Sequence, residues 1–454
     1  MDRERRRQVK IVTAFMALNV LSNSLMDVCD MGTSTTTVQR GSGSLHIPSS
    51  IPAWIPIVAI LGVRTYADAL LGRKKRRRFW SALRGQGVWE TDFLRNYPLM
   101  TMQYRVPDFE NAQYIDHLRM GKEEFWRFHE EFGRLLARKD TKWRASIPSH
   151  KRLAITLHWL AHGPTFRELA RQYAIGKSTA VHIVHSTVDI LFKDMAPRSI
   201  RFPEGKELKK TMQEFEDLAK LERCGGAVDG TFMKIKKPQV QFADCYWCYK
   251  KYSAIIILGT VDACGLFLNV NAGRAGSAGD ASVYASSRLA RKIGERKWLT
   301  IKETETEKFT IQGSYIRPYL VGDSAFPLSA TLMKCYDDNA ALLPWQRTFN
   351  YRLIRTRRVV EQAFGRLKGR FRVLVHNNLN DPEFASRVAI VCCAIHNVCE
   401  RWRCPVEATW LIDDATYDKY HPGPNDQPNA EFDQAGLSIR NKLAQYTHQQ
   451  HPIA

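Results

Sequence analysis

Three acidic residues in this 454-residue chain could together bind divalent metal ions. Asp229 and Asp323 each stand at the end of a short apolar run, and Glu361 lies on a helical stretch. Carboxylates are the hard oxygen ligands that Mg²⁺ and Mn²⁺ prefer. Two such ions, about 4 Å apart, can clamp the attacking and leaving oxygens of a phosphodiester bond. The pattern therefore favours metal-dependent phosphodiester cleavage, with these three residues as the metal ligands.

The elements that must position these acids alternate between strands and helices. Strands are predicted for four short apolar runs, at residues 225–231, 253–261, 266–271 and 319–323. Helices are expected at 280–289 and 356–371, and the second has an apolar stripe with Glu361 on its flank. Three strands, helix, strand and helix in this order predict an α/β fold. We expect an RNase H-like catalytic domain at residues 220–404.

An all-α region is predicted before this domain, within residues 71–200, and its first clear helix is expected at 110–136. Three shorter helices are predicted at residues 151–162, 165–173 and 177–191, the second opened by a capping box of Thr165 and Glu168. Helix, tight turn and helix is the helix-turn-helix arrangement, here at about 150–192. The residues expected to face DNA are Lys177, Ser178, Thr179 and His182. A helical bundle that only supports the catalytic domain is the alternative.

The charge of the chain favours a polyanionic partner. The formal net charge is +21 and the pI is about 9.6. Lys234 and Lys236 follow the first acid, and Arg357 and Arg358 flank Glu361, so all four are expected to contact phosphates. The same helical stretch carries further basic residues predicted to lie along a phosphate track: Arg352, Arg355, Arg366, Lys368 and Arg370. Solubility alone is the plainer reading of the charge.

The remaining segments say less about function. The ten cysteines lack the spacing of a disulfide framework, which favours a reducing compartment. Zinc ligands could be drawn from the pair Cys245 and Cys248, or from Cys392, His396, Cys399 and Cys404, but cysteines in a helical run are usually buried packing residues. No transmembrane helix is predicted. We expect a poorly defined N-terminal segment and linker at 1–70, an import signal or phosphate-binding patch at 73–78, and a disordered tail at 405–454.

Several segments resemble the signature blocks of the PIF/Harbinger transposases and their domesticated nuclease relatives. The three blocks are VDGTFMKIKKP (228–238), VGDSAFPL (321–328) and NYRLIRTRRVVEQAFGRLKGRFRVL (350–374). Residues 259–287 and 389–400 are similar to two further blocks, so the resemblance covers roughly residues 75–405. The chain departs from the family at Gly279, where His is usual, and at Phe326, where Tyr is frequent.

This resemblance implies a DDE-type endonuclease and transposase with Asp229, Asp323 and Glu361 as the DDE metal ligands and Asp280 as an accessory acid. Its substrates would be double-stranded DNA at terminal inverted repeats and at the target site, cut by metal-activated water and joined through a 3′-hydroxyl. The resemblance also implies a Myb-like DNA-binding accessory protein and a nuclear location, with the cytoplasm as the location until a partner imports the chain. It is compatible with a homo-oligomer and implies no membrane.

Two other functions stay open at this point. The first is a domesticated transposase that acts as a non-cutting DNA-binding or chromatin-associated protein. The second is an RNase H-like hydrolase that cleaves RNA in a hybrid duplex. Loss of DNA cutting in an Asp323→Ala variant would separate an endonuclease from the first, and the choice of substrate would separate it from the second.

Overall fold

The computed structural model describes residues 38–40, 43–45, 107–140, 146–239, 241–300, 310–311, 313–337, 342–376, 381–410 and 433–452. The chain divides into two units, Met1–Leu83 with Lys142–Arg144 and Arg84–Thr141 with Ala145–Ala454. In the first unit the described residues form an antiparallel pair of strands, β1 (Val38–Arg40) and β2 (Gly43–Leu45). The rest of the predicted N-terminal segment, and the basic cluster at 73–78, lie outside the described residues.

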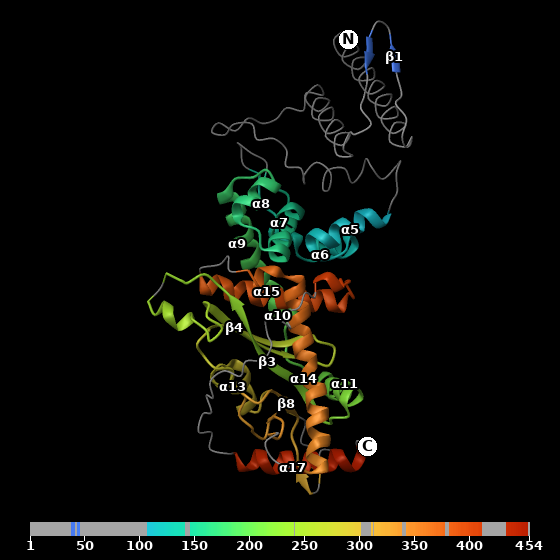
Figure 1. Ribbon diagram of the computed structural model, residues 1–454, viewed down its shortest axis with the longest axis vertical. Coiled ribbons are helices and arrows are strands. Elements are labelled where there is room, and N and C mark those ends of the chain that lie inside the picture. Colours follow the sequence, from blue (N-terminus) through green and yellow to red (C-terminus); the bar gives the residue numbers. More distant parts are fainter. Residues whose placement is uncertain are drawn as a thin grey trace. The chain divides into compact units, whose positions relative to one another are not determined.

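A set of helices precedes the sheet in the second unit (Figure 1). They are α5 (Pro107–Leu118), α6 (Lys122–Leu136), α7 (Ser149–His162), α8 (Phe166–Gln172), α9 (Lys177–Asp194), α10 (Ala196–Ser199) and α11 (Lys206–Ala219). The single helix predicted at 110–136 is two helices, because Arg119 adopts a left-handed conformation (φ 61°) and Gly121 caps the second one. Within the described ranges, no helix has the length and apolar character needed to cross a membrane.

The centre of the unit is a five-stranded mixed sheet with the strand order β5-β4-β3-β8-β9. Its strands are β3 (Cys224–Lys234), β4 (Ala254–Val261), β5 (Phe267–Ala275), β8 (Tyr319–Val321) and β9 (Leu332–Met333). β3, β4 and β5 are antiparallel to one another, whereas β8 runs parallel to β3 and β9 runs parallel to β8. A separate hairpin is formed by β6 (Thr310–Ile311) and β7 (Ser314–Tyr315). The predicted α/β architecture is therefore confirmed at the level of a mixed sheet with helices.

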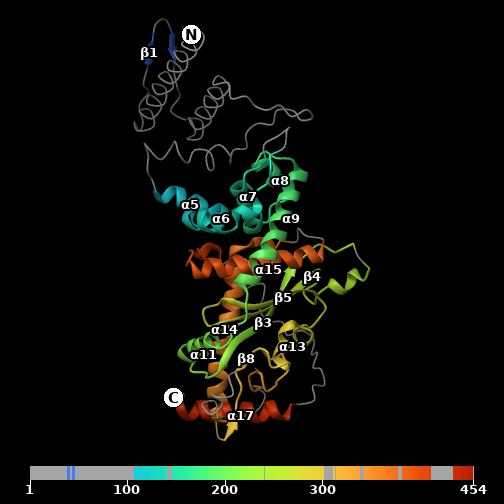
Figure 2. The same cartoon turned by 180° about the vertical axis from the view of Figure 1, so that it is seen from behind.

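Helices cover both faces of this sheet (Figures 1 and 2). One face packs against α14 (Pro344–Arg370) and α15 (Pro382–Arg401), and the other against α12 (Asp280–Ala285) and α13 (Arg288–Gly294). The two faces alternate along each strand, so Ala227 points toward the first pair of helices and Val228 toward the second. The helix predicted at 356–371 begins earlier, at Pro344, a residue type favoured in a first turn.

The end of the chain differs from its predicted disorder. Residues 434–450 form a helix, α17 (Gln434–Gln450), whose N-cap Asp433 accepts a hydrogen bond from the Ala435 N–H. Leu443 and Ala444 are buried against the domain. The Thr348 hydroxyl of α14 lies 2.8 Å from His448 Nδ1. The prediction of a disordered tail is wrong for this segment, because one narrow apolar stripe is enough to anchor a polar helix on α14.

The residues drawn as zinc ligands pack the core instead. Cys392, Cys399 and His396 are buried on α15, and His396 Nε2 lies 3.2 Å from the Gly265 carbonyl oxygen. Among the residues that the structure describes, no group of three or more His, Cys, Asp or Glu side chains is arranged to hold a metal ion. In the lone CxxC pair, Cys245 is exposed and Cys248 is buried.

Candidate active site

Two of the predicted acids are brought side by side by the register of the sheet. Ala227 of β3 pairs with Val321 of β8, and these two strands are parallel. Asp229 and Asp323 each stand two residues further on, so they share one face of the sheet at the same level. This is the face that α14 covers. The carboxyl end of β8 therefore places the two carboxylates next to each other.

The surroundings of these two aspartates disfavour their charged forms. Burial raises the pKa of Asp229 to about 8, and the neighbouring Asp323 carboxylate acts in the same direction. The Gly230 N–H donates a hydrogen bond to Asp229 Oδ1 (2.8 Å), which opposes this shift. Burial also raises the pKa of Asp323, against the charge of Arg357 and a hydrogen bond from the Ala325 N–H. A cation between two such carboxylates would stabilise their ionised forms.

A third acid approaches the pair from the opposite face of the sheet. Asp280 is the first residue of α12, and its carboxylate lies against Gly230, where a Cβ atom would collide with it. Burial, together with the nearby Asp323 carboxylate, raises the pKa of Asp280 to about 6. The predicted accessory acid thus belongs to the same cluster. Only a glycine in β3 permits this close approach, which a side chain at position 230 would block.

Glu361 lies near the aspartates on α14, but its side chain has another partner. Phe364, one turn further along, packs so closely on the sheet that a Cβ atom at Gly259 would be 2.8 Å from its ring. Glu361 is 44% exposed, and its Oε1 pairs with Arg357 Nη2 at 2.7 Å. The charge of Arg357 in turn lowers the pKa of both Asp229 and Asp323. Asp229, Asp323 and Asp280 thus form the acidic cluster, and Glu361 is connected to it through Arg357.

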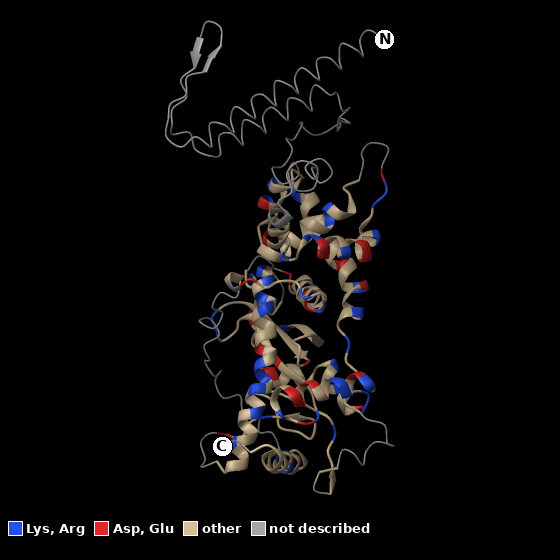
Figure 3. Ribbon diagram, turned by 90° about the vertical axis from the view of Figure 1, so that its right-hand side faces the viewer, with Lys and Arg blue, Asp and Glu red and all other residues tan. Residues whose placement is uncertain are grey.

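Some of the predicted phosphate contacts lie at the surface near this cluster. Arg358 and Lys236 are exposed, whereas Arg357 and Lys234 are half-buried. The Lys234 ammonium lies 5.2 Å from the centre of the Tyr252 ring. Lys and Arg recur along α14, as the blue segments of the ribbon in Figure 3 mark. The exposed side of this helix carries Arg347, Tyr351, Ile354, Arg355 and Arg358. Sequence reasoning missed Arg347, because the helix begins twelve residues before its predicted start.

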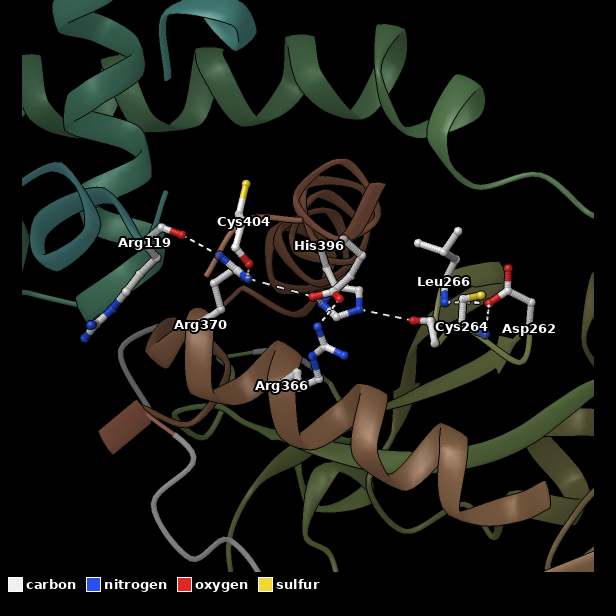
Figure 4. A network of polar contacts seen from close by, with 10 residues as sticks. Arg119, Asp262, Cys264, Leu266, Arg366, Arg370, His396 and Cys404 are labelled. Atoms are coloured by element: carbon white, nitrogen blue, oxygen red, sulfur yellow. Dashed lines mark hydrogen bonds and ion pairs between the residues drawn. The ribbon is translucent and has the colours of Figure 1, made fainter. Parts of the chain in front are cut away.

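Two arginines predicted to lie along a phosphate track pair with a glutamate of α15, and one of them is turned into the protein. Arg370 is fully buried and donates hydrogen bonds to the carbonyl oxygens of Arg119 (2.5 Å) and Cys404 (3.4 Å) (Figure 4). Its guanidinium lies 3.8 Å from the carboxylate of Glu400 on α15, which also pairs with Arg366. This network joins α14 to α15 and to the end of α5. The phosphate-contact prediction is wrong for Arg370, whereas for Arg366, whose side chain is 40% exposed, it stays a prediction.

Two more basic residues of α14 are also buried. Arg352 donates to the carbonyl oxygens of Ala219 (3.2 Å) and His451 (2.5 Å), so it ties α14 to α11 and to the end of α17. Lys368 is buried as well. These two side chains have a role in packing, and their predicted phosphate contacts are likewise wrong. Of the basic residues on this helix, those on the exposed row remain free to face a polyanion.

The three helices of the predicted helix-turn-helix correspond to α7, α8 and α9, while their assignment as a DNA-binding motif stays a prediction. Thr165 and Glu168 form the expected capping box at the start of α8, with the Glu168 N–H donating to Thr165 Oγ1. On α9, Lys177, Ser178 and His182 are exposed and Thr179 is half-buried. The other side of α9 is buried against α7, α8 and α15. The residues predicted to face DNA therefore lie on the free side of this helix, and their contact with DNA stays a prediction.

Comparison with known proteins supports part of these assignments. Residues 228–397 match a protein family described as DDE superfamily endonuclease. Protein ALP1-like of Arabidopsis thaliana is 28% identical over 251 residues, which cover 54% of this chain and 59% of that protein. The protein Antagonist of Like Heterochromatin Protein 1 of the same plant is 26% identical over 249 residues, which cover 55% of this chain and 61% of that protein. The chain thus spans about three-fifths of the length of these relatives. No solved structure matches it.

Proposed function

Because residues 228–397 match the DDE superfamily endonuclease family, we propose that the chain is a metal-dependent endonuclease that cuts double-stranded DNA. The observation that carries this proposal is that Asp229 on β3 and Asp323, which follows the end of the neighbouring parallel strand β8, lie close together, with Asp280 beside them. We assign the mixed sheet and its covering helices to the RNase H-like fold. The cut sites in this proposal are the terminal inverted repeats and target sites of a transposon.

The donor set fits Mg²⁺ or Mn²⁺, which would supply an activated water and a counter-charge for the phosphate when bound. Asp229 and Asp323 would hold the ion, and Glu361 would join them once its side chain leaves Arg357. That exchange would free the Arg357 guanidinium for the scissile phosphate. Asp280 would orient the site from the other face of the sheet, across Gly230.

The duplex in this proposal has two contact regions. The exposed row on α14, with Arg347, Arg355 and Arg358, provides positive charge leading to Glu361. The free side of α9, with Lys177 and His182, provides a helix for the major groove. The net charge of +21 supports a polyanionic substrate. A Myb-like partner, a nuclear location and self-association belong to the proposal on sequence resemblance alone.

A second function is favoured by one feature of the site. The Glu361 carboxylate is held by Arg357, and among the described residues no three acids form a ready metal site. A chain that kept this arrangement in solution would bind DNA without cutting it. The name of one relative, which describes an antagonist of a heterochromatin protein, agrees with a chromatin-associated role.

Cleavage of supercoiled plasmid and labelled duplex in Mg²⁺ or Mn²⁺ separates the two functions. We expect nicking by the full chain and its loss in Asp229→Asn, Asp323→Asn and Glu361→Gln, all with DNA binding retained. Asp217→Asn, a change of an exposed acid on α11, is the matched control and should cut normally. DNA binding without cleavage by any form, with a partner protein supplied, would instead favour the non-cutting function. Cleavage only of an RNA–DNA hybrid would favour a hydrolase of the RNase H type.

A further inference from the structure

The connection between β3 and β4 carries a group of exposed aromatic side chains, and we call residues 241–252 the aromatic arm. Phe242 is 73% exposed, Trp247 is 54% exposed and Tyr249 is 48% exposed. Single exposed apolar residues are ordinary on protein surfaces. Three large exposed rings within eight residues of chain are less ordinary, because exposed apolar surface that gathers in one region usually marks an interaction site.

The backbone of the arm is held in place although its rings face outward. Cys248 is buried, and its N–H donates to the Tyr252 carbonyl oxygen (2.9 Å). Trp247 forms a β-bridge with Ser253 at the base of the arm. The Ser277 N–H donates to the Cys245 carbonyl oxygen (3.1 Å), which fixes the arm to the segment leading into α12. The aromatic side chains are therefore presented on a prearranged support, which lowers the entropic cost of binding a ligand.

The arm lies next to the acidic cluster. Tyr249 meets the Phe232 ring edge to face, with 5.5 Å between the ring centres. Phe232 stands two residues after Gly230 on the same face of β3, about 7 Å along the strand. The Asp280 carboxylate lies against Gly230 on this face. The arm extends from the sheet beside β4 in both views of the ribbon (Figures 1 and 2). A ligand bound at the acids could therefore reach the arm directly.

Lysines accompany the rings of the arm. The Lys250 ammonium lies 5.6 Å from the centre of the Phe232 ring and 5.9 Å from that of Tyr249. Lys251 and Lys236 are exposed, and Lys237 forms an exposed ion pair with Asp244 (2.7 Å). Aromatic rings alternating with lysines are typical of proteins that bind single-stranded nucleic acid, in which bases stack on the rings and phosphates lie near the cations. Lysines are depleted in protein–protein interfaces, so the lysines among these rings favour a nucleic acid over a partner protein.

We propose that the aromatic arm binds unpaired bases of a DNA strand held beside the acidic cluster. The inference rests on the proposed endonuclease function for the identity of the nucleic acid. It adds that the two strands of the DNA substrate are unpaired next to the scissile phosphate. Trp247 is the main stacking platform, because it has the largest ring, and Tyr249 extends that platform toward Phe232.

Fluorescence anisotropy with fluorescein-labelled single strands and blunt duplexes tests the arm in Ca²⁺, without any need for cutting. Trp247→Ala should weaken binding of the single strand by about 5-fold to 150-fold. Its effect on the duplex should be less than about 2-fold, because paired bases cannot stack on the arm. Trp247→Phe should keep most of the affinity. Tyr315→Ala, which removes a 40% exposed ring on β7, is the matched control and should bind as the wild type does.

The outcomes separate this inference from the proposed function. If the wild type cuts duplex DNA and Trp247→Ala binds single strands normally, the arm has another role and the inference fails alone. If no form cuts but Trp247→Ala loses single-strand affinity selectively, the inference stands and the endonuclease proposal fails. A wild type without affinity for single strands overturns the inference, as does an equal loss in Trp247→Ala and Tyr315→Ala. In an enzyme that cuts, a duplex with mismatched bases beside the cut should restore activity to Trp247→Ala.

Discussion

Two arginines on α14 should respond in opposite ways to the same substitution. Arg370 is fully buried, donates to two backbone carbonyl oxygens and faces Glu400, whereas Arg358 is exposed on the row that leads to Glu361. Arg370→Met would leave two buried acceptors and a buried carboxylate without this partner. Breaking a buried pair of this kind costs about 3–5 kcal/mol. Since Arg366 still contacts Glu400, we expect about 3 kcal/mol, at the lower end of that range. Arg358→Met should change stability by less than about 0.5 kcal/mol.

The assay pairs urea unfolding with DNA binding over a range of salt concentrations. For Arg358→Met we expect the slope of log affinity against log salt to fall by about 1, as one phosphate contact is lost. For Arg370→Met we expect the slope of the folded protein to be unchanged. An Arg370→Met variant as stable as the wild type, with a reduced salt slope, would refute the assignment of this arginine to the core. A large loss of stability in Arg358→Met would refute the assignment of Arg358 to the DNA-facing row.

Three further predictions concern stability. Asn397→Ala removes hydrogen bonds to the Phe267 backbone and the Ser199 carbonyl oxygen, so urea unfolding should show a loss of about 3 kcal/mol. Thr165→Ala removes the capping box of α8 and should lower the unfolding free energy by about 1 kcal/mol in the same assay. Burial lowers the pKa of His158 and of His396 to about 3, from an unfolded value of 6.5. Below pH 6.5 the unfolded chain therefore binds protons that the folded chain does not, and stability falls with pH until the folded histidines titrate. The loss between pH 8 and pH 5 should be about 2 kcal/mol for each histidine, and a pH-independent stability over this range would contradict it.

The parts of the fold that sequence could predict depend on continuous apolar patterns. The run at 253–261 is apolar throughout because β4 is covered on both faces, and the structure has a strand there. The acids at 229 and 323 could be expected to meet, because each follows such a run. The capping box at Thr165 fixed the start of α8 through local chemistry alone. Each of these signals is contained in a few consecutive residues, so it could be recognised without knowledge of tertiary contacts.

Other features depend on contacts between distant segments. Nothing local indicates that Arg352 hydrogen-bonds to the end of α17 or that Glu361 pairs with Arg357. The burial of Arg370 could have been predicted from its spacing. It stands three residues after Leu367, on the buried stripe of α14. The apolar stripe of α17 is so narrow that the sequence of this helix could not be distinguished from that of a polar, disordered tail. The aromatic arm could not be recognised as a binding surface from the sequence, because the sequence does not show that its rings are exposed.

Direct measurement of divalent cation binding tests the central claim, that the acidic cluster is a metal site. Electron paramagnetic resonance of Mn²⁺ added to the full chain, with duplex DNA present, reports the bound fraction of the ion. We predict that Asp229→Asn and Asp323→Asn each weaken Mn²⁺ binding by about 10-fold or more, while Asp217→Asn binds as the wild type does. Equal Mn²⁺ binding by the wild type and both site variants would contradict it.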